Sequence, residues 1–503
     1  MKKGFPLFFS AISFIIAGVV LLTITGIPLS IRLPEKNLAL LLIAVAAIPA
    51  ISGILRGSFD VFEPIHYLSL SFAIYYGLMV IILMQTDSFY MLGQNYEHMV
   101  GKMLLLALIA LISAYAGYYS WRSTTRVSRL TNYNSRSFLS ASERAFLHQV
   151  TIWIFLFFAT LVVLWIIVAR IPTRSLFVFG GSGYGSWRAD AQGPAIGYLY
   201  LARNSLAACI IMMLATRPNV SDIPWKYILL TAAIAVFLAG TGGRTRVMYV
   251  VLGVWSFLYL ERQRRPSITQ TLLFSSFIFY VLIGAIGFFR RQGRVIGQTE
   301  YGLGQAWSTF EESTGIAVST AAKLYWIPDY TGWLGGQSFI KVFIQWIPSS
   351  LWAQKHQFYN NSTLQMIQDY FPDGSATAYW TTWYINFGIL GIAVGMVLLA
   401  IIFKEVYYRY HREPDNLFLQ ANLALAGAFL ISMSGRGDPT AWTYNAIAVF
   451  APIWISRFFL QRYRQSQNIS QHQLYSTQDR RSDITGKHRI PGYSASDVAH
   501  KSI

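Results

Sequence analysis

The sequence has little charge and almost no cysteine. Only 12% of its 503 residues are Asp, Glu, Lys or Arg, about half the share found in soluble domains. The single cysteine, Cys209, lies in an apolar run, which excludes an intramolecular disulfide framework and a cysteine-rich metal site. No His, Asp or Glu residues have the spacing of metal ligands, and the Asp-x-Asp pattern of metal-dependent sugar-nucleotide enzymes is absent. We therefore expect no metal and no cofactor.

Acidic residues are the scarcer of the charged residues. The 40 Lys and Arg residues exceed the 22 Asp and Glu residues and give a net charge of +18. Such an excess is typical of nucleic-acid-binding proteins, but 54% of the residues are hydrophobic and apolar runs of about 20 residues recur along the chain. These runs are apolar on every side, as a helix in a bilayer is. The composition thus predicts an all-α, polytopic integral membrane protein and excludes nucleic acid as a partner.

Apolar windows separated by Pro, Gly and charged residues predict about twelve transmembrane helices. The expected spans are residues 5–28, 37–54, 64–84, 100–120, 148–169, 196–216, 226–242, 245–260, 268–289, 379–403, 417–434 and 441–459. Lys2 and Lys3 precede the first of these runs, which is long enough to span the bilayer. We expect it to remain as a helix rather than to be cleaved as a signal peptide.

The positions of Lys and Arg predict the orientation. Basic residues favour the cytoplasmic side, and the loops 122–147, 261–266 and 404–416 are all basic. Placing these loops inside puts both termini in the cytoplasm. We expect residues 1–465 to form the membrane domain. Residues 466–503 are rich in Ser, Gln, His and Arg without apolar periodicity, which predicts a disordered cytoplasmic tail.

The longest segment between spans, about 290–378, then faces outside. It is rich in Trp and Tyr, which favour the membrane–water interface. Amphipathic stretches such as residues 337–353 are expected to lie along the bilayer surface.

Several arginines fall in outward loops or in the outer halves of spans, against the usual charge bias. They are Arg170, Arg174, Arg188, Arg203, Arg244, Arg246, Arg290, Arg291, Arg294 and Arg436. A single such arginine is explained by a side chain that reaches the headgroups, but a group of them favours an anionic ligand. Guanidinium binds phosphate with two parallel hydrogen bonds and never loses its charge, so a diphosphate fits better than a carboxylate. The Gly-rich turn 240–246 is the strongest case, with a plain hairpin turn as the alternative.

Four strings resemble those of a bacterial family, the Wzy-type O-antigen polymerases, within the O-antigen polymerase and ligase superfamily. They are Asp60–Pro64 (a D-x-F-x-P pattern), Gly242–Thr245, Ile347–Trp352 and Tyr384–Gly391. Their order and the predicted topology agree with the family over roughly residues 55–450. Trp383 stands where many relatives carry an acidic residue, so no base can be transferred to that position.

The resemblance implies a GT-C-like helical fold in the bacterial inner membrane and the polymerisation of oligosaccharide repeat units linked to undecaprenyl pyrophosphate. It implies that the reaction occurs on the periplasmic face, that undecaprenyl pyrophosphate leaves, and that no metal takes part. The expected partners are the lipid-linked glycan and membrane lipid, and a chain-length regulator and a flippase remain open as further partners. Two alternatives also remain open: an O-antigen ligase, and a transporter or flippase for a lipid-linked sugar.

The implied reaction needs a site for the leaving pyrophosphate and a base for the attacking hydroxyl. The residues expected to bind pyrophosphate are Arg244 and Arg246 first, then Arg290, Arg291 and Arg294, with Arg188 and Arg436 in support. The candidates for the catalytic base are His356, Glu311 and Asp369. His356 is the one histidine of the large outer loop. An exposed loop position for His356, and a helix surface for Glu311, are the alternatives.

Overall fold

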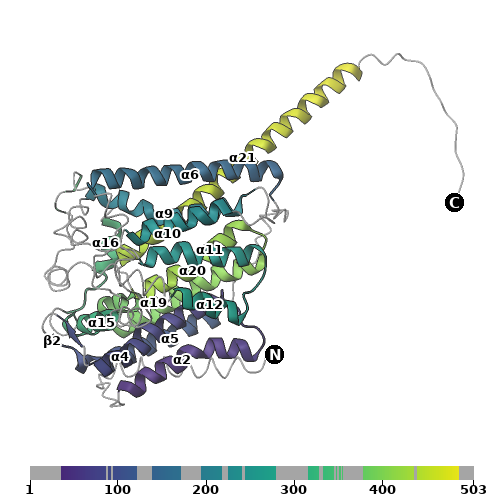
Figure 1. Ribbon diagram of the computed structural model, residues 1–503. Coiled ribbons are helices and arrows are strands. Elements are labelled where there is room, and N and C mark those ends of the chain that lie inside the picture. The colour runs from purple at the N-terminus through teal and green to yellow at the C-terminus, as the bar shows by residue number, and fades with distance from the viewer. Residues whose placement is uncertain are drawn as a thin grey trace, which may run out of the picture.

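The computed structural model is a bundle of helices that run side by side, with chain connections at its two ends (Figure 1). It describes residues 35–86, 89–91, 94–121, 139–171, 194–217, 225–240, 244–278, 315–327, 332–344, 347, 351–352, 354, 378–435 and 439–486.

The first half of the chain contributes several helices, one of which is interrupted by a π-helical turn, and a hairpin of two strands of two residues each. The elements are α2 (Glu35–Leu55), α3 (Pro64–Phe72), the π-helical turn η1 (Ala73–Leu78), α4 (Met79–Thr86), β1 (Tyr90–Met91), β2 (Gln94–Asn95), the 3₁₀ turn η2 (Glu97–Met99), α5 (Val100–Ser120), α6 (Ala141–Val168), α9 (Pro194–Ala215) and α10 (Trp225–Gly240). β1 and β2 pair antiparallel, Tyr90 with Asn95 and Met91 with Gln94.

The second half completes the bundle. Its elements are α11 (Arg244–Glu261), α12 (Ile268–Phe277), α15 (Gly315–Trp326), α16 (Gln337–Ile344), α19 (Tyr379–Arg412), α20 (Leu417–Gly435) and α21 (Pro439–Gly486). Within the described residues, seven helical segments are long and apolar enough to cross a membrane. The predicted all-α, polytopic membrane fold is thus confirmed. The number of twelve spans stays a prediction, because the expected span 5–28 and the second part of the expected span 268–289, from residue 279, lie outside the described residues.

Most of the predicted spans agree with helices of the structure to within a few residues, and α6 shows why some bounds differ. Its span was expected from residue 148, whereas the helix begins at Ala141. Ser140 caps it: the Ser140 hydroxyl accepts from the backbone N–H of Glu143 at 3.2 Å, and the Ser140 N–H donates to the Glu143 carboxylate at 2.8 Å. This reciprocal capping stabilises a polar first turn that hydropathy does not register.

The expected disorder from residue 466 differs from the structure over residues 466–486, where α21 continues as a helix to Gly486. No Pro or Gly occurs between residues 453 and 485. Extending an existing helix costs far less than nucleating one, so a polar sequence without breakers continues it. The C-terminal part of α21 projects beyond the rest of the bundle (Figure 1). Residues 487–503 lie outside the described part of the chain.

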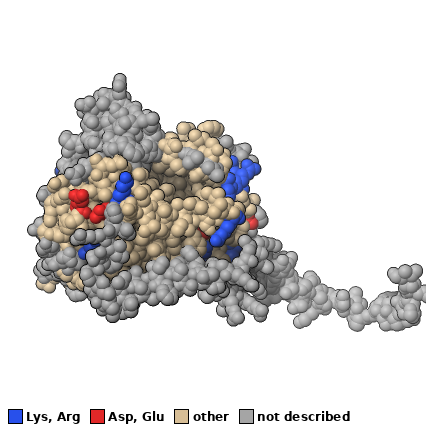
Figure 2. Space-filling view, turned by 90° about the horizontal axis from the view of Figure 1, so that it is seen from below, with Lys and Arg blue, Asp and Glu red and all other residues tan. Residues whose placement is uncertain are grey.

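The basic loops meet at one end of the bundle. Arg265 pairs with Asp60 at 2.8 Å, Arg217 with Glu261 at 2.9 Å, and Arg464 with Glu143 at 2.6 Å. Arg144 also donates to the Arg217 carbonyl at 3.4 Å, and Gln263 donates to the Asp415 carboxylate at 2.5 Å. These contacts bring the described parts of the loops 122–147, 261–266 and 404–416 to a common side, as the charge pattern predicts. On the face shown in Figure 2, an uncharged band separates a group of Lys and Arg side chains at this end from a mixed acidic and basic group at the other. That the more basic end is cytoplasmic stays a prediction; the opposite end is called the outer end below.

The segment 290–378 contributes two described helices of different character. α16 exposes Ile340 and Phe343 and buries Val342 and Ile344, and such an amphipathic helix suits a bilayer surface. α15, in contrast, is buried along its length from Ile316 to Leu324. Part of this predicted outer loop is therefore enclosed by the bundle.

Candidate functional site

Two arginines lie against one tyrosine ring at the outer end of the bundle. Tyr200, Arg203 and Asn204 follow one another at helical spacing along α9 and so share one face. The guanidinium carbon of Arg203 lies 3.2 Å from the centroid of the Tyr200 ring, and that of Arg246, in the first turn of α11, lies 4.9 Å from it. The ring thus brings together cationic side chains from two helices.

Hydrogen bonds fix the position of Arg246. Its Nε donates to the side-chain oxygen of Asn204 at 2.8 Å, and its Nη2 donates to the Tyr200 hydroxyl at 2.9 Å. Both acceptors are uncharged. These two contacts therefore orient the guanidinium through acceptors that carry no negative charge.

Arg203 is fully buried, and its guanidinium lies between two aromatic rings. In addition to Tyr200, the ring of Trp165 on α6 lies 5.2 Å from the Arg203 guanidinium carbon, and the two rings meet edge to face at 5.3 Å. Cation–π contact offsets part of the cost of burying the guanidinium. The buried guanidinium of Arg203 therefore adds positive potential to this region.

A third helix, α21, packs against this arginine cluster, which consists of Tyr200, Arg203, Asn204 and Arg246. The Asn204 amide donates to the side-chain oxygen of Asn445 at 2.8 Å, and Ser205 donates to the Ala448 carbonyl at 2.7 Å. α9, α11 and α21 all begin at this end of the bundle, and the amino-terminal ends of helices carry partial positive charge. Two guanidinium groups and several helix dipoles of the same sign make this region suited to an anion.

The strings that suggested a family have specific structural roles. In D-x-F-x-P, one Asp60 oxygen accepts the backbone N–H of Phe62 at 3.0 Å, and Pro64 is the first residue of α3. The Phe62 ring is buried against Trp255 of α11 at 5.7 Å. Pro at the first position of a helix loses no hydrogen bond. This string therefore sets the start of α3 at the basic end of the bundle.

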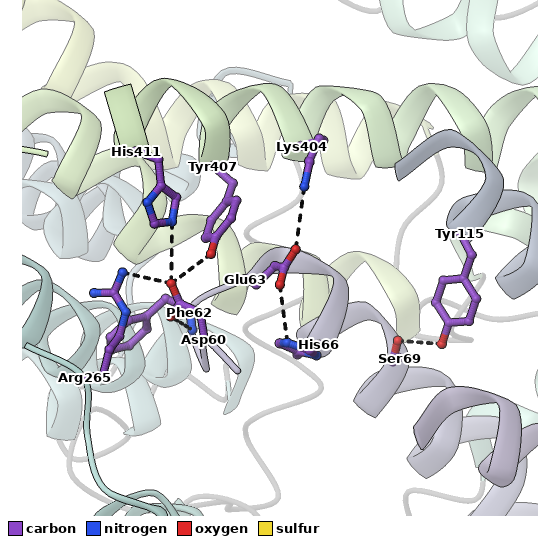
Figure 3. Close-up of polar contacts among 10 residues, drawn as sticks. All are labelled: Asp60, Phe62, Glu63, His66, Ser69, Tyr115, Arg265, Lys404, Tyr407 and His411. Atoms are coloured by element: carbon purple, nitrogen blue, oxygen red, sulfur yellow. Dashed lines mark hydrogen bonds and ion pairs between the residues drawn. The ribbon is translucent and has the colours of Figure 1, made fainter. Parts of the chain in front are cut away.

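Asp60 is also the centre of an ion-pair cluster, shown in Figure 3. Its second oxygen accepts from Arg265 at 2.8 Å and from the Tyr407 hydroxyl at 2.9 Å, and it lies 3.6 Å from Nε2 of His411. Burial alone would raise the pKa of Asp60. The contacts with His411, Arg265, Phe62 N–H and Tyr407 outweigh it and hold the pKa below the ordinary value.

Glu63 extends this cluster along α19. One of its oxygens lies 3.7 Å from the Lys404 ammonium, and the other lies 3.6 Å from His66. Asp60 and Glu63 together connect the start of α3 to α19 and to the loop between α11 and α12.

The string Tyr384–Gly391 marks a break in α19. Gly388 has φ 68° and ψ −155°, a region that only glycine adopts readily. The carbonyls of Ile385 and Asn386 accept the backbone N–H groups of Leu334 and Gly335 at 3.0 and 3.2 Å. Exposed backbone groups are costly within a membrane protein, and the Leu334–Gly335 segment satisfies them.

Asn386 supplies the side-chain part of this arrangement. Its oxygen accepts from the backbone N–H of Gly336 at 3.1 Å, and its amide nitrogen donates to Ser338 and to the Thr382 carbonyl at 2.6 and 2.7 Å. Asn386 thus joins the outer part of α19 to the start of α16.

A family model for O-antigen polysaccharide polymerase Wzy matches residues 76–463, most of the chain. The chain belongs to this family. It is accordingly a membrane polymerase of O-antigen repeat units, with the glycosyltransferase-like activity and lipid-linked glycan substrate that the family implies. No curated protein and no solved structure matches the chain.

The Wzy match confirms the resemblance predicted from the sequence. Of the strings that suggested it, Gly242–Thr245, Ile347–Trp352 and Tyr384–Gly391 lie within the matched residues, and Asp60–Pro64 precedes them. A polymerase family favours polymerisation over the ligase and transporter alternatives.

The expected site residues of this Wzy polymerase are only partly described. Arg246 belongs to the cluster on Tyr200, and Arg244 begins α11, although its side chain lies outside the described residues. The other expected residues also lie outside them: Arg188, Glu311, His356, Asp369, Arg290, Arg291, Arg294 and Arg436.

The structure adds Tyr200, Arg203, Asn204 and Asn445 to the candidate site. The sequence marks Arg203 as one arginine among many at the outer side. A signal was present in α9, where tyrosine, arginine and asparagine lie three and four residues apart on one face of an apolar span. Asn445 has no such signal, because only the packing of α21 on α9 brings it to Asn204.

Proposed function

We propose that this Wzy polymerase joins oligosaccharide repeat units carried on undecaprenyl pyrophosphate, at the periplasmic face of the inner membrane, with undecaprenyl pyrophosphate as the leaving group. The observation that carries the proposal is the pairing of Arg203 and Arg246 on Tyr200 at the outer end of the bundle. A lipid-linked diphosphate is an anion held at the depth of the headgroups, where this cluster lies in the proposed orientation.

The proposed reaction requires the site to stabilise negative charge on the leaving pyrophosphate. A hydroxyl oxygen of one repeat unit forms a bond to the anomeric carbon of the growing chain, and the bond from that carbon to the pyrophosphate oxygen breaks. The pyrophosphate leaves with the electron pair, so negative charge grows on it in the transition state. Preorganised arginines stabilise such charge, and a lost donor typically costs about 10²–10³ in rate.

Arg246 is the arginine placed to contact the pyrophosphate, because it is partly exposed and its guanidinium is oriented by neutral partners. Arg203 is enclosed and raises the local positive potential. Arg244, Arg290, Arg291 and Arg294 are proposed to complete the site, with Arg188 and Arg436 in support. The energy of the existing bond to pyrophosphate drives the transfer. The proposed reaction is metal-independent, because the arginines supply the positive charge that stabilises the leaving pyrophosphate.

The hydroxyl proton passes to a base as the new bond forms. His356, Glu311 and Asp369 remain the proposed candidates, and all belong to the segment 290–378. Of these, an imidazole has the pKa closest to neutral, which favours His356.

In the cell we propose an inner-membrane protein with both termini in the cytoplasm. Its proposed partners besides the glycan are a chain-length regulator that ends polymer growth and a flippase that delivers repeat units to the outer face.

Complementation tests this function and separates it from the ligase alternative. In a strain that lacks the gene, the loss of a polymerase leaves surface lipid A-core with one repeat unit, whereas the loss of a ligase leaves polymer on undecaprenyl pyrophosphate. The wild-type gene should restore a polymer ladder on gels, and Arg246→Ala should not. Arg409→Ala, an exposed arginine of α19 paired with Glu405, is the matched control and should restore it. A full ladder in the gene-deleted strain contradicts the proposal.

A further inference from the structure

Asn204 is the residue through which the cluster is tied together. Its side-chain oxygen accepts from Arg246 of α11, and its amide nitrogen donates to Asn445 of α21. Asn204 is almost fully buried, so both halves of its amide are occupied by helices other than its own.

These two contacts impose a direction on the amide. Nε of arginine can only donate, so it requires the oxygen of Asn204, and this leaves the amide nitrogen facing α21. The Asn445 oxygen accepts from that nitrogen. Arg246 therefore fixes the orientation of Asn204, and Asn445 accepts the hydrogen bond from the amide nitrogen in that orientation.

The charge of the side chain at position 204, which accepts the hydrogen bond from Arg246, matters as much as its position. A buried carboxylate at position 204 would form an ion pair with Arg246 and cancel much of its charge. An amide of the same size accepts the same hydrogen bond and brings no negative charge to the guanidinium. The Tyr200 hydroxyl, the second acceptor, is neutral as well.

We propose that Asn204 is a positioning residue that holds Arg246 in place through a neutral acceptor, and that Asn445 supports the orientation in which Asn204 does so. The inference rests on the proposed function, because it assigns Arg246 to the pyrophosphate of the lipid-linked substrate. It adds α21 to the elements that build the site.

The chain offers a close control for this role. Ser205, the next residue of α9, also bonds to α21, at the Ala448 carbonyl. Ser205→Ala removes one hydrogen bond between the same two helices without touching Arg246. A structural role of the α9–α21 contact would make the Ser205 and Asn445 variants behave alike, whereas a positioning role separates them.

The experiment uses the purified full-length protein in nanodiscs and inorganic pyrophosphate as the probe. Binding is measured by calorimetry, and folding of each variant is checked by its thermal unfolding temperature. Arg246→Ala is included to define the binding that belongs to this site. Asn204→Asp should weaken pyrophosphate binding by roughly tenfold or more, because the new carboxylate competes for the guanidinium. Asn445→Ala should weaken it by a smaller factor, and Ser205→Ala should leave it unchanged.

The outcomes separate this inference from the proposed function. Wild-type affinity in a folded Asn204→Asp variant overturns the positioning role, as does equal weakening by Asn445→Ala and Ser205→Ala. Pyrophosphate binding that does not depend on Arg246 also overturns it. A wild-type protein that binds pyrophosphate through Arg246 and Asn204 but forms no polymer from lipid-linked repeat units supports the positioning role and refutes the proposed function.

Discussion

The Arg265 guanidinium donates to the Asp60 carboxylate across 2.8 Å and joins the start of α3 to the loop between α11 and α12. Asp60 is mostly buried and also holds Tyr407 and His411. Asp60→Asn keeps the size of the side chain but removes the charge that these donors face. We expect the free energy of unfolding to fall by about 1–3 kcal/mol, the typical cost of losing charge-assisted hydrogen bonds. Thermal or denaturant unfolding of the purified protein measures it.

The control for this variant is Arg409→Gln. It breaks the pair between Arg409 and Glu405 at 2.8 Å, but Arg409 is 58% exposed. Exposed pairs of this kind contribute about 0.5 kcal/mol or less. Equal effects of Asp60→Asn and Arg409→Gln would show that the Asp60 cluster contributes no more than a surface ion pair.

The same carboxylate predicts a pH dependence of stability. The pKa of Asp60 is lower in the folded protein than its ordinary value of 3.8, so the folded state favours the ionised form. Its contribution is therefore complete above pH 3.8 and is lost as the pH falls through the folded pKa. The difference in unfolding temperature between the wild type and Asp60→Asn should be constant near neutral pH and should shrink in acid below that value. A difference that grows as the pH falls would contradict this assignment.

The break in α19 predicts a strict requirement for glycine at position 388. Gly388→Ala places a Cβ at 3.5 Å from Trp333, an ordinary contact, so the cost comes from the backbone. A non-glycine residue at φ 68° and ψ −155° costs about 1–3 kcal/mol. The unfolding temperature should fall clearly. Gly315→Ala, where no atom lies near the added Cβ and φ is not positive, should leave it nearly unchanged.

A base at His356 predicts a change in pH profile. His356→Ala should lower the rate of polymerisation at saturating substrate and remove the fall in rate below about pH 6–7 that protonation of a histidine base produces. Its affinity for pyrophosphate should stay that of the wild type, which distinguishes it from Arg246→Ala. An unchanged pH profile would transfer the role to Glu311 or Asp369, and each is tested by its own amide variant.

Much of the fold could be predicted because membrane helices are long apolar runs. α2, α5, α10, α11 and α20 begin and end within a few residues of the predicted spans. The sequence pattern is less informative where polar helical turns extend a span, as at Ser140 before α6 and along α21 to Gly486. Hydropathy detects the apolar residues that can lie within the bilayer. Capping and helix continuation depend on local backbone hydrogen bonds and also occur in polar sequence, so hydropathy does not detect them.

The site could be predicted only in part. Arg246 was expected to bind an anion because arginines in outward turns oppose the usual charge bias of membrane proteins, and a group of them favours a phosphate ligand. Its partner Asn204 is 42 residues away in the sequence, and Asn445, the partner of Asn204, is 241 residues from Asn204. Such contacts depend on which helices pack together, and the pattern of apolar and polar residues in one sequence does not predict which helices are neighbours.

The central claim is that Arg246 stabilises the departing pyrophosphate, and reconstituted turnover tests it most directly. Purified wild-type, Arg246→Ala and Arg409→Ala proteins in proteoliposomes receive repeat units on undecaprenyl pyrophosphate, with chelator present. Release of undecaprenyl pyrophosphate and polymer length are then measured together. We expect the wild type and Arg409→Ala to release it with matching polymer growth, and Arg246→Ala to be about 10²–10³ slower. Turnover by Arg246→Ala at the wild-type rate would contradict the account.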